Sequence, residues 1–288
     1  MEQHFIDVYG LKMHYRSCGD GPVMLFLHGM PTSSYLWRKI MPNLGNDYRC
    51  IAPDLMGMGR SDKPTDIAYT IDDHIRYVHG FIDALGLKDI TIVMHAWGSI
   101  IGFEYARQYA SNVAGLIFYE SHFQSAYKSE DLSLPIAEFL SMIKTQDNIY
   151  QKVIEENFLV ENFVHAGMMN TLSPEELAEY TAPFIEKAHR KVLLQYVNEL
   201  PFGKKANRVI DIVEGYTQFL QTSDIPKLLL YSIPGFSTSV SSITWAQEHL
   251  RHITVRDIGT GLHFAQETNP EAFVKAISVW QKTVASNT

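Results

Sequence analysis

The sequence has few cysteines, no long apolar run and no block of like charge. Its 288 residues include only two cysteines, Cys18 and Cys50, too few for a disulfide scaffold and without the paired spacing of a zinc site. The longest apolar runs, such as Val23–Leu27, are much shorter than the ~20 residues that cross a bilayer. The 24 basic and 32 acidic residues never form a run of five like charges, which argues against a nucleic-acid-binding face.

The amino-terminal residues lack the basic and apolar regions of a secretory signal. We therefore expect a reduced, cytoplasmic protein, a monomer or a dimer, with no nucleic acid or membrane partner and with no metal or other cofactor. The composition is 46% hydrophobic and 19% charged, which is ordinary for a globular protein. It excludes disorder, because so much apolar material can offset the entropy of chain ordering.

Strand-like and helix-like segments alternate along the first part of the chain. Short apolar segments predict strands at residues 23–27, 48–52, 89–94 and 113–119. Apolar residues at helical spacing predict helices at residues 71–85 and 99–109. This alternation predicts an α/β fold, with a mostly parallel sheet and helices on both of its faces.

The alternation is interrupted in the middle of the chain. From about residue 125 to residue 205 the sequence is helical and richer in charge, and a helix start is predicted with Ser173 as N-cap and Pro174 at the first helical position. The α/β pattern then resumes, with strands at 227–231 and 253–257 and a last helix at 270–284. We therefore predict an α/β core of residues 1–125 and 206–288, interrupted by a helical insertion of residues 126–205.

The most informative motif is a strand that passes directly into a helix. Residues 91–103 read TIVMHAWGSIIGF, which is the context of a nucleophile elbow. In an elbow, a strained turn pushes its middle side chain above the carboxyl end of the sheet. The middle position here is Ala96, whose methyl group can neither attack a substrate nor carry a proton. Ser99 lies inside the following helix and is a poor substitute.

Other motifs lie where an elbow would need partners. The loop His28-Gly29-Met30-Pro31 follows a strand and offers backbone N–H groups near the elbow. His263, in the loop between the last strand and the last helix, is the expected general base. Glu120 directly follows the last residue of a strand, where a carboxylate can orient a histidine and stabilise its charged form. Asp54 ends another strand and is expected to brace the loop that follows it.

These stretches resemble the haloalkane dehalogenases of the α/β-hydrolase superfamily and their relatives, the Renilla-type luciferases. The matching segments, in order along nearly the whole chain, are HGMPTSSYLWR (28–38), RCIAPDLMGMGRSDKP (49–64), DDHIRYVHGFIDALGL (72–87), HAWGS (95–99), NELPF (198–202) and GLHFAQETNP (261–270). The resemblance implies an α/β-hydrolase fold, with a mostly parallel eight-stranded sheet, helices on both faces and a helical cap.

The resemblance also implies a role for each of five positions. An aspartate at position 96 would attack the substrate and form an alkyl-enzyme ester, and His263, supported by Glu120, would activate water to hydrolyse it. The indole N–H of Trp97 and an asparagine amide at position 30 would hold the leaving halide. His263, Glu120 and Trp97 match the family. Ala96 and Met30 do not, and without the nucleophile the covalent mechanism is not expected in this chain.

Three interpretations of the function follow. The chain is an inactivated Asp-to-Ala variant of a hydrolase that acts on haloalkanes, epoxides or esters. Alternatively, it is a natural enzyme that uses His263 and Glu120 without a covalent intermediate, for hydrolysis, cyclisation or cofactor-free oxygen chemistry of the luciferase kind. In the third, it is a non-catalytic protein that binds a small molecule.

All three interpretations predict an apolar small-molecule ligand beneath a cap that controls access to it. The candidate pocket walls are Phe123, Phe139, Phe158, Phe163, Met168 and Phe264.

Overall fold

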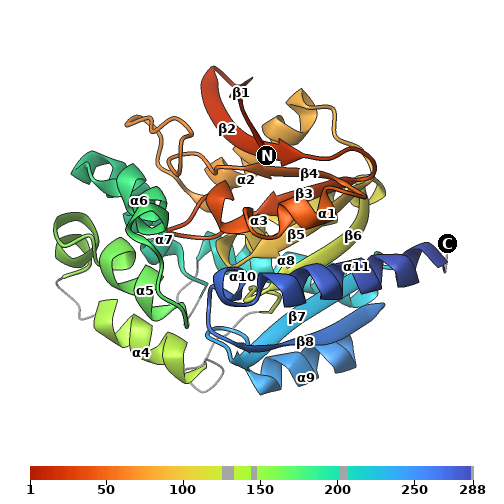
Figure 1. Ribbon diagram of the computed structural model, residues 1–288. Coiled ribbons are helices and arrows are strands. Elements are labelled where there is room, and N and C mark those ends of the chain that lie inside the picture. The colour runs from red at the N-terminus through yellow and green to blue at the C-terminus, as the bar shows by residue number, and fades with distance from the viewer. Residues whose placement is uncertain (125–132, 144–147, 202–206, 287–288) are drawn as a thin grey trace.

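An eight-stranded sheet forms the centre of the computed structural model, which describes residues 1–124, 133–143, 148–201 and 207–286 (Figure 1). The strands are β1 (Glu2–Val8), β2 (Leu11–Cys18), β3 (Val23–Leu27), β4 (Arg49–Pro53), β5 (Ile90–His95), β6 (Val113–Tyr119), β7 (Lys227–Pro234) and β8 (Ile253–Gly261). Their order in the sheet is β1-β2-β4-β3-β5-β6-β7-β8. Only β2 runs against the others, so the predicted mostly parallel sheet is confirmed.

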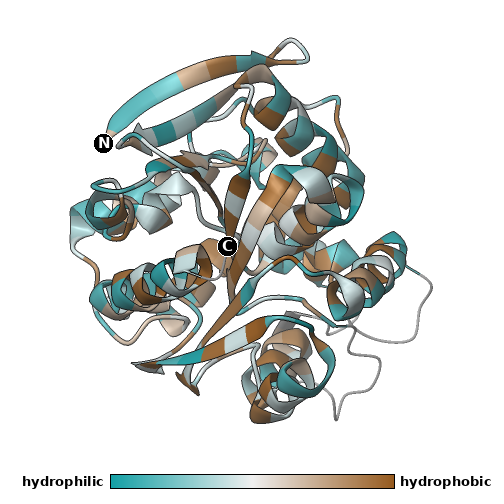
Figure 2. Cartoon of the chain, turned by 90° about the vertical axis from the view of Figure 1, so that its right-hand side faces the viewer, coloured by the Kyte–Doolittle hydropathy of each residue, from teal (hydrophilic) through white to brown (hydrophobic). Residues whose placement is uncertain are grey.

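Helices cover both faces of this sheet. They are α1 (Met41–Leu44), α2 (Ile71–Ala84), α3 (Trp97–Gln108), α8 (Arg208–Thr222), α9 (Val240–His249), α10 (Ala265–Thr268) and α11 (Pro270–Ser286), with short 3₁₀ turns η1 (Ser34–Trp37) and η2 (Ala110–Asn112). Helix α3 packs against α2 and α8 on one face, and α1 packs against α11 on the other. Figure 2 shows the strands between them as largely hydrophobic, which places the core along the sheet.

The sequence predicted the buried strands more accurately than the edge of the sheet. The predicted strands at 23–27 and 113–119 coincide with β3 and β6, whereas β1 and β2 were missed. Strand β1 is largely exposed, and its apolar Phe5 faces solvent. An edge hairpin of this kind carries no continuous apolar run, which is the signal of a strand buried on both faces.

Between β6 and α8, residues 134–143 and 148–199 form a helical segment beside the sheet (Figure 1). It comprises α4 (Leu134–Ile143), η4 (Gln151–Glu155), η5 (Leu159–Phe163), α5 (Val164–Ala166), α6 (Pro174–Thr181), η6 (Ala182–Phe184), η7 (Lys187–Arg190) and α7 (Lys191–Glu199). Helix α6 begins as predicted, because Ser173 and Glu176 cap each other's backbone N–H groups. The predicted boundaries at residues 126 and 205 lie outside the described residues.

A buried carboxylate ties the helical segment to the core. Glu267 of α10 is fully buried and forms an ion pair with Arg38. Arg38 also pairs with Glu176 of α6 at 2.5 Å, and the Tyr180 hydroxyl of the same helix donates to Glu267 at 2.5 Å. Because a buried charge is costly without partners, these contacts hold α6 in place against the core. No helix in the described ranges is long and apolar enough to span a membrane.

Candidate active site

The turn between β5 and α3 has the geometry of an elbow. Ala96 lies between the two elements with φ 47° and ψ −119°, a conformation that is strained for a residue with a side chain. Gly98 permits the close approach of α3 to the end of β3, because a Cβ at this position would lie 2.5 Å from the carbonyl oxygen of Leu27. The strand-to-helix turn predicted from the sequence is therefore present, with a methyl group at its apex.

Two residues from distant parts of the chain form a histidine–carboxylate pair beside this turn. His263, after β8, donates from Nδ1 to Oε2 of Glu120, after β6, at 3.1 Å. Both side chains are buried. Glu120 also has a positive φ of 50°, so Ala96 and Glu120 both adopt strained backbone conformations of the kind found at functional sites. The sequence predicted this pair.

The loop after β7 supplies further donors to the same carboxylate. Oε1 of Glu120 accepts from the backbone N–H groups of Phe236 at 3.1 Å and Thr238 at 3.3 Å. Oε2 accepts from the backbone N–H and the hydroxyl of Ser237. Although burial opposes ionisation, the bonds from His263 and from this loop lower the pKa of Glu120 below its ordinary value. No sequence motif marks this loop, which carries no charged residue.

His95 joins the elbow to the loop that carries His263. Its Nε2 lies 2.9 Å from the carbonyl oxygen of His263, and the two imidazole rings are 4.5 Å apart between centroids. His95 is the last residue of β5 and precedes Ala96 directly. The structure therefore places the base against the residue that directly precedes the apex of the elbow.

Three further histidines around the pair are buried: His28, His95 and His122. Burial lowers the pKa of each, and that of His122 falls to about 4. These three rings are therefore neutral near pH 7. His263 differs from them in its partner, because its Nδ1 donates to the Glu120 carboxylate. The sequence analysis did not single out His122, which follows Glu120 by two residues.

The loop at residues 28–31 passes against the elbow. A Cβ at Gly29 would lie 2.7 Å from the Ala96 Cβ and 3.2 Å from the Trp97 backbone nitrogen. His28 steadies the loop, because its Nδ1 donates to the Gly29 carbonyl at 2.8 Å and its Nε2 accepts from the backbone of Leu55 at 2.9 Å. Met30 is buried. The loop therefore lies next to the elbow, as the sequence predicted.

Trp97 offers a hydrogen-bond donor that is not used within the described part of the chain. Its indole is fully buried, and Nε1 has no partner among those residues. The ring packs edge-to-face on Tyr196 of α7, with 5.0 Å between centroids. An unpaired buried N–H is costly, and such groups are often satisfied by a ligand. Tyr196 was not predicted from the sequence.

Two polar residues near the motifs have purely structural partners. The Ser99 hydroxyl donates to the Ala96 carbonyl at 2.6 Å and accepts from the His122 backbone at 2.9 Å, so it is no substitute nucleophile. Asp54 accepts from the backbone of Ser34 at 2.7 Å and of Arg60 at 2.8 Å. It therefore braces its loop, as predicted. Although burial opposes ionisation, a bond from His14 helps lower the pKa of Asp54 to about 2.

An apolar cavity of about 650 Å³ lies between the helical segment and the loops after β7 and β8; Leu262 lines it, whereas His263 and the elbow residues do not. Its walls include the predicted Phe139, Phe158 and Phe163, together with Phe236, which the sequence analysis missed. The rings of Phe163 and Phe236 each lie 5.2 Å from the His263 ring. The cavity therefore approaches the base through these two aromatic side chains.

The other three predicted wall residues do not line this cavity. Phe123 packs on Phe118 and Trp245. Phe264 lies 4.8 Å from the His263 ring and close to Gly167. Met168 is buried.

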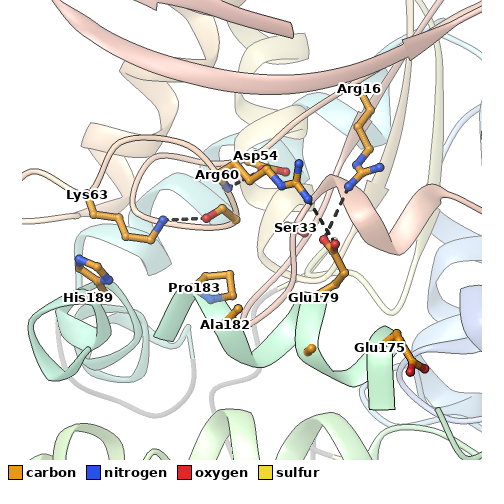
Figure 3. Close-up of a pocket in the computed structure, with 12 residues that line it drawn as sticks. Arg16, Ser33, Asp54, Arg60, Lys63, Glu175, Glu179, Ala182, Pro183 and His189 are labelled. Carbon is orange, nitrogen blue, oxygen red and sulfur yellow. Dashed lines mark hydrogen bonds and ion pairs between the residues drawn. The ribbon is translucent and has the colours of Figure 1, made fainter. Parts of the chain in front are cut away.

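A second cavity, of about 430 Å³, lies between the core and α6 and has charged walls (Figure 3). Figure 3 shows Arg16 and Arg60 directed at Glu179, with ion-pair distances of 3.7 and 3.2 Å. Lys63 instead donates to the Gly59 carbonyl at 2.7 Å. None of the elbow or base residues lines this cavity. In the described ranges, no group of three or more metal-ligating side chains is found.

Comparisons with known proteins agree with this geometry. The family model described as the alpha/beta hydrolase fold matches residues 22–270. A haloalkane dehalogenase of Agrobacterium fabrum is 34% identical over 98% of this chain and 92% of its own length. A coelenterazine h 2-monooxygenase of Renilla reniformis is 33% identical over 98% of this chain and 89% of its own. The crystal structure of haloalkane dehalogenase DbeA from Bradyrhizobium elkani has a TM-score of 0.94 and 33% identity, and covers 100% of this chain and 99% of its own.

Proposed function

Because this chain belongs to the α/β-hydrolase family, in the group of the haloalkane dehalogenases and the Renilla monooxygenase, we propose that it is an enzyme acting on an apolar small molecule. His263 serves as its general base, Glu120 supports that base, and no covalent enzyme intermediate forms. The observation that carries this proposal is the buried His263–Glu120 pair, which is complete although the side chain at position 96 is a methyl group.

The pair is built to accept a proton. Nδ1 of His263 donates to Glu120, which leaves Nε2 as the nitrogen that takes a proton from water or from the substrate. The imidazolium that forms is stabilised by the ionised Glu120. Four other hydrogen bonds hold this carboxylate in place, so it need not reorganise when the charge develops.

Negative charge on the substrate would be stabilised at the elbow. The backbone N–H of Trp97 begins α3, where the helix dipole is positive. The indole N–H of Trp97, which has no partner among the described residues, is a further donor, and we assign the same role to the backbone N–H of Met30. These groups remain useful without a nucleophile, because an enolate, an alkoxide or a tetrahedral oxyanion needs the same donors as a halide.

The apolar cavity supports a hydrophobic substrate. Its aromatic walls reach the His263 ring through Phe163 and Phe236, and we place the reacting group of the substrate between these rings and the elbow. The helical segment then acts as a lid that excludes water and limits the size of the substrate.

A second candidate function is cofactor-free oxygenation. It is favoured by the likeness to the relative described as a coelenterazine h 2-monooxygenase. In this version His263 removes a proton from the substrate, and the substrate anion reacts with molecular oxygen. The remaining interpretations, an inactivated hydrolase and a non-catalytic binding protein, differ from these two in predicting no turnover by this chain.

The test is a screen for turnover of esters, epoxides, bromoalkanes and coelenterazine by this chain and its variants. For any substrate turned over, we expect His263→Gln and Glu120→Gln to lower kcat by about 10²–10⁴-fold. His249→Gln is the matched control, because His249 is an exposed histidine at the end of α9, and it should retain full activity. Undiminished turnover in His263→Gln would refute the proposal. Binding without turnover of any compound would favour the non-catalytic protein.

A further inference from the structure

The two cysteines, 32 positions apart in the sequence, face each other in the sheet. Cys18 ends β2, and its Cα partner in the antiparallel pairing with β4 is Cys50. Directly opposed residues in antiparallel strands have Cα atoms about 4.5–5.5 Å apart and side chains on one face. That separation lies inside the range of about 4.4–6.8 Å found for disulfides. Both thiols are free, and a hydrogen bond links their side chains.

The two thiols differ in exposure. Cys18 is half-buried and lines a surface cavity of about 370 Å³, together with Ser17, Gly19 and Asp20. Cys50 is fully buried. A small oxidant can therefore reach Cys18 directly from the cavity, whereas Cys50 is reached only through its neighbour. This asymmetry suits a pair in which one thiol reacts first and the second resolves the product.

We propose that Cys18 and Cys50 form a redox modification site, a dithiol that a peroxide converts into a reversible disulfide between β2 and β4. In the first step the Cys18 thiolate attacks hydrogen peroxide, which oxidises the sulfur to a sulfenic acid and releases water. In the second step the Cys50 sulfur displaces the sulfenic hydroxyl, the S–S bond forms, and a second water leaves with the thiol proton. A dithiol reductant reverses the change by thiol–disulfide exchange.

The burial of the two thiols determines the rate of this oxidation. Burial raises the pKa of the Cys18 thiol and that of the Cys50 thiol, so little thiolate is present at neutral pH. The thiolate is the reactive form. The site therefore oxidises slowly, under sustained exposure to peroxide, and the experiment must run to completion.

The bond would restrain a part of the chain that reaches the candidate active site. Residues 19–49 lie between the two cysteines, and they include β3 and the loop that places Gly29 against Ala96. Closing a loop of this length reduces the freedom of the unfolded chain. We expect Tm to rise by about 5 °C on oxidation and to return on reduction.

The test is intact-protein mass spectrometry of the full chain after prolonged treatment with hydrogen peroxide and capping of residual thiols with N-ethylmaleimide. We expect the loss of two hydrogen atoms, no maleimide label and a cross-linked peptide that contains both cysteines. Treatment with dithiothreitol should restore two labels. In the matched variants C18S and C50S no such loss can occur. C50S, which keeps the accessible thiol, should add oxygen atoms instead.

Two results would overturn the proposal. One is the addition of oxygen to the wild-type chain without loss of the two hydrogens. The other is a disulfide-linked dimer on a non-reducing gel. A cross-linked chain whose Tm equals that of the reduced chain would overturn the restraint inferred for residues 19–49. None of these readouts depends on enzymatic activity.

Discussion

His95 Nε2 lies 2.9 Å from the carbonyl oxygen of His263, although 168 positions separate the two residues. His95 ends the strand that leads into the elbow, so this contact joins the elbow to the base without involving the side chain at position 96. The arrangement of the site therefore does not depend on a nucleophile. It should accept one without rebuilding, which makes the chemistry at position 96 testable.

The first prediction concerns covalent chemistry at position 96. The chain as it stands should form no adduct with 1-bromohexane, because a methyl group cannot attack carbon. Ala96→Asp should create ester formation. The ester should accumulate in the double variant A96D/H263Q, in which water is no longer activated. Mass spectrometry of the peptide containing residue 96 measures this, and an adduct on Ala96 itself would contradict it.

The second prediction concerns backbone strain at the elbow. Ala96→Gly relieves the strain that the positive φ imposes on a residue with a side chain. This gain in stability offsets the lost contacts of the methyl group and the greater freedom of glycine in the unfolded chain. Ala106→Gly, at a buried position in the last turn of α3, loses the same methyl group and gains the same freedom in the unfolded chain, with no strain relieved. Urea denaturation should therefore find A96G more stable than A106G by at least about 1 kcal/mol. Equal stabilities would mean that the elbow is unstrained.

The third prediction concerns the indole N–H of Trp97. Trp97→Phe removes this donor and keeps an aromatic ring against Tyr196. For a substrate found in the screen, we expect kcat/KM to fall by about 10²–10³-fold, the usual effect of losing one oxyanion donor. Trp37→Phe is the control, because Trp37 is equally buried and its Nε1 also lacks a partner in the described part of the chain, but its ring packs on Phe26 of β3. A similar loss of activity in both variants would indicate a packing effect.

The fourth prediction concerns stability in acid. Burial lowers the pKa of His74 in α2 to about 4, and neither ring nitrogen has a partner in the described residues. The imidazole of His74 therefore binds a proton more readily in the unfolded chain than in the folded one. Its contribution to the free energy of unfolding is complete above pH 6.5 and is lost as the pH falls towards 4. The loss should be about 2 kcal/mol at pH 5.

His74→Leu should lack this part of the pH dependence. The comparison is the difference in unfolding free energy between pH 7 and pH 5, measured for each protein with urea. Any packing defect in the variant cancels in that difference. The same difference in both proteins would show that His74 does not titrate in this range.

Some features of this protein follow from its sequence alone. Strands β3 and β6 were predicted to the residue, because strands buried on both faces are continuous apolar runs. Ser173 as N-cap and Pro174 at the first helical position marked the start of α6 for a similarly local reason. The pairing of Glu120 with His263 was also predictable, because the carboxyl ends of parallel strands meet at one edge of a sheet.

Other features were decided only by the tertiary structure. The loop of Phe236–Thr238 holds Glu120 through backbone N–H groups, which every residue but proline carries and no motif reports. The place of the β1–β2 hairpin at the edge of the sheet, the contact of Tyr196 with Trp97 and the pairing of Cys18 with Cys50 depend likewise on how distant segments pack. Local spacing specifies turns, caps and buried strands, whereas contacts between remote segments are set by the free energy of the whole fold.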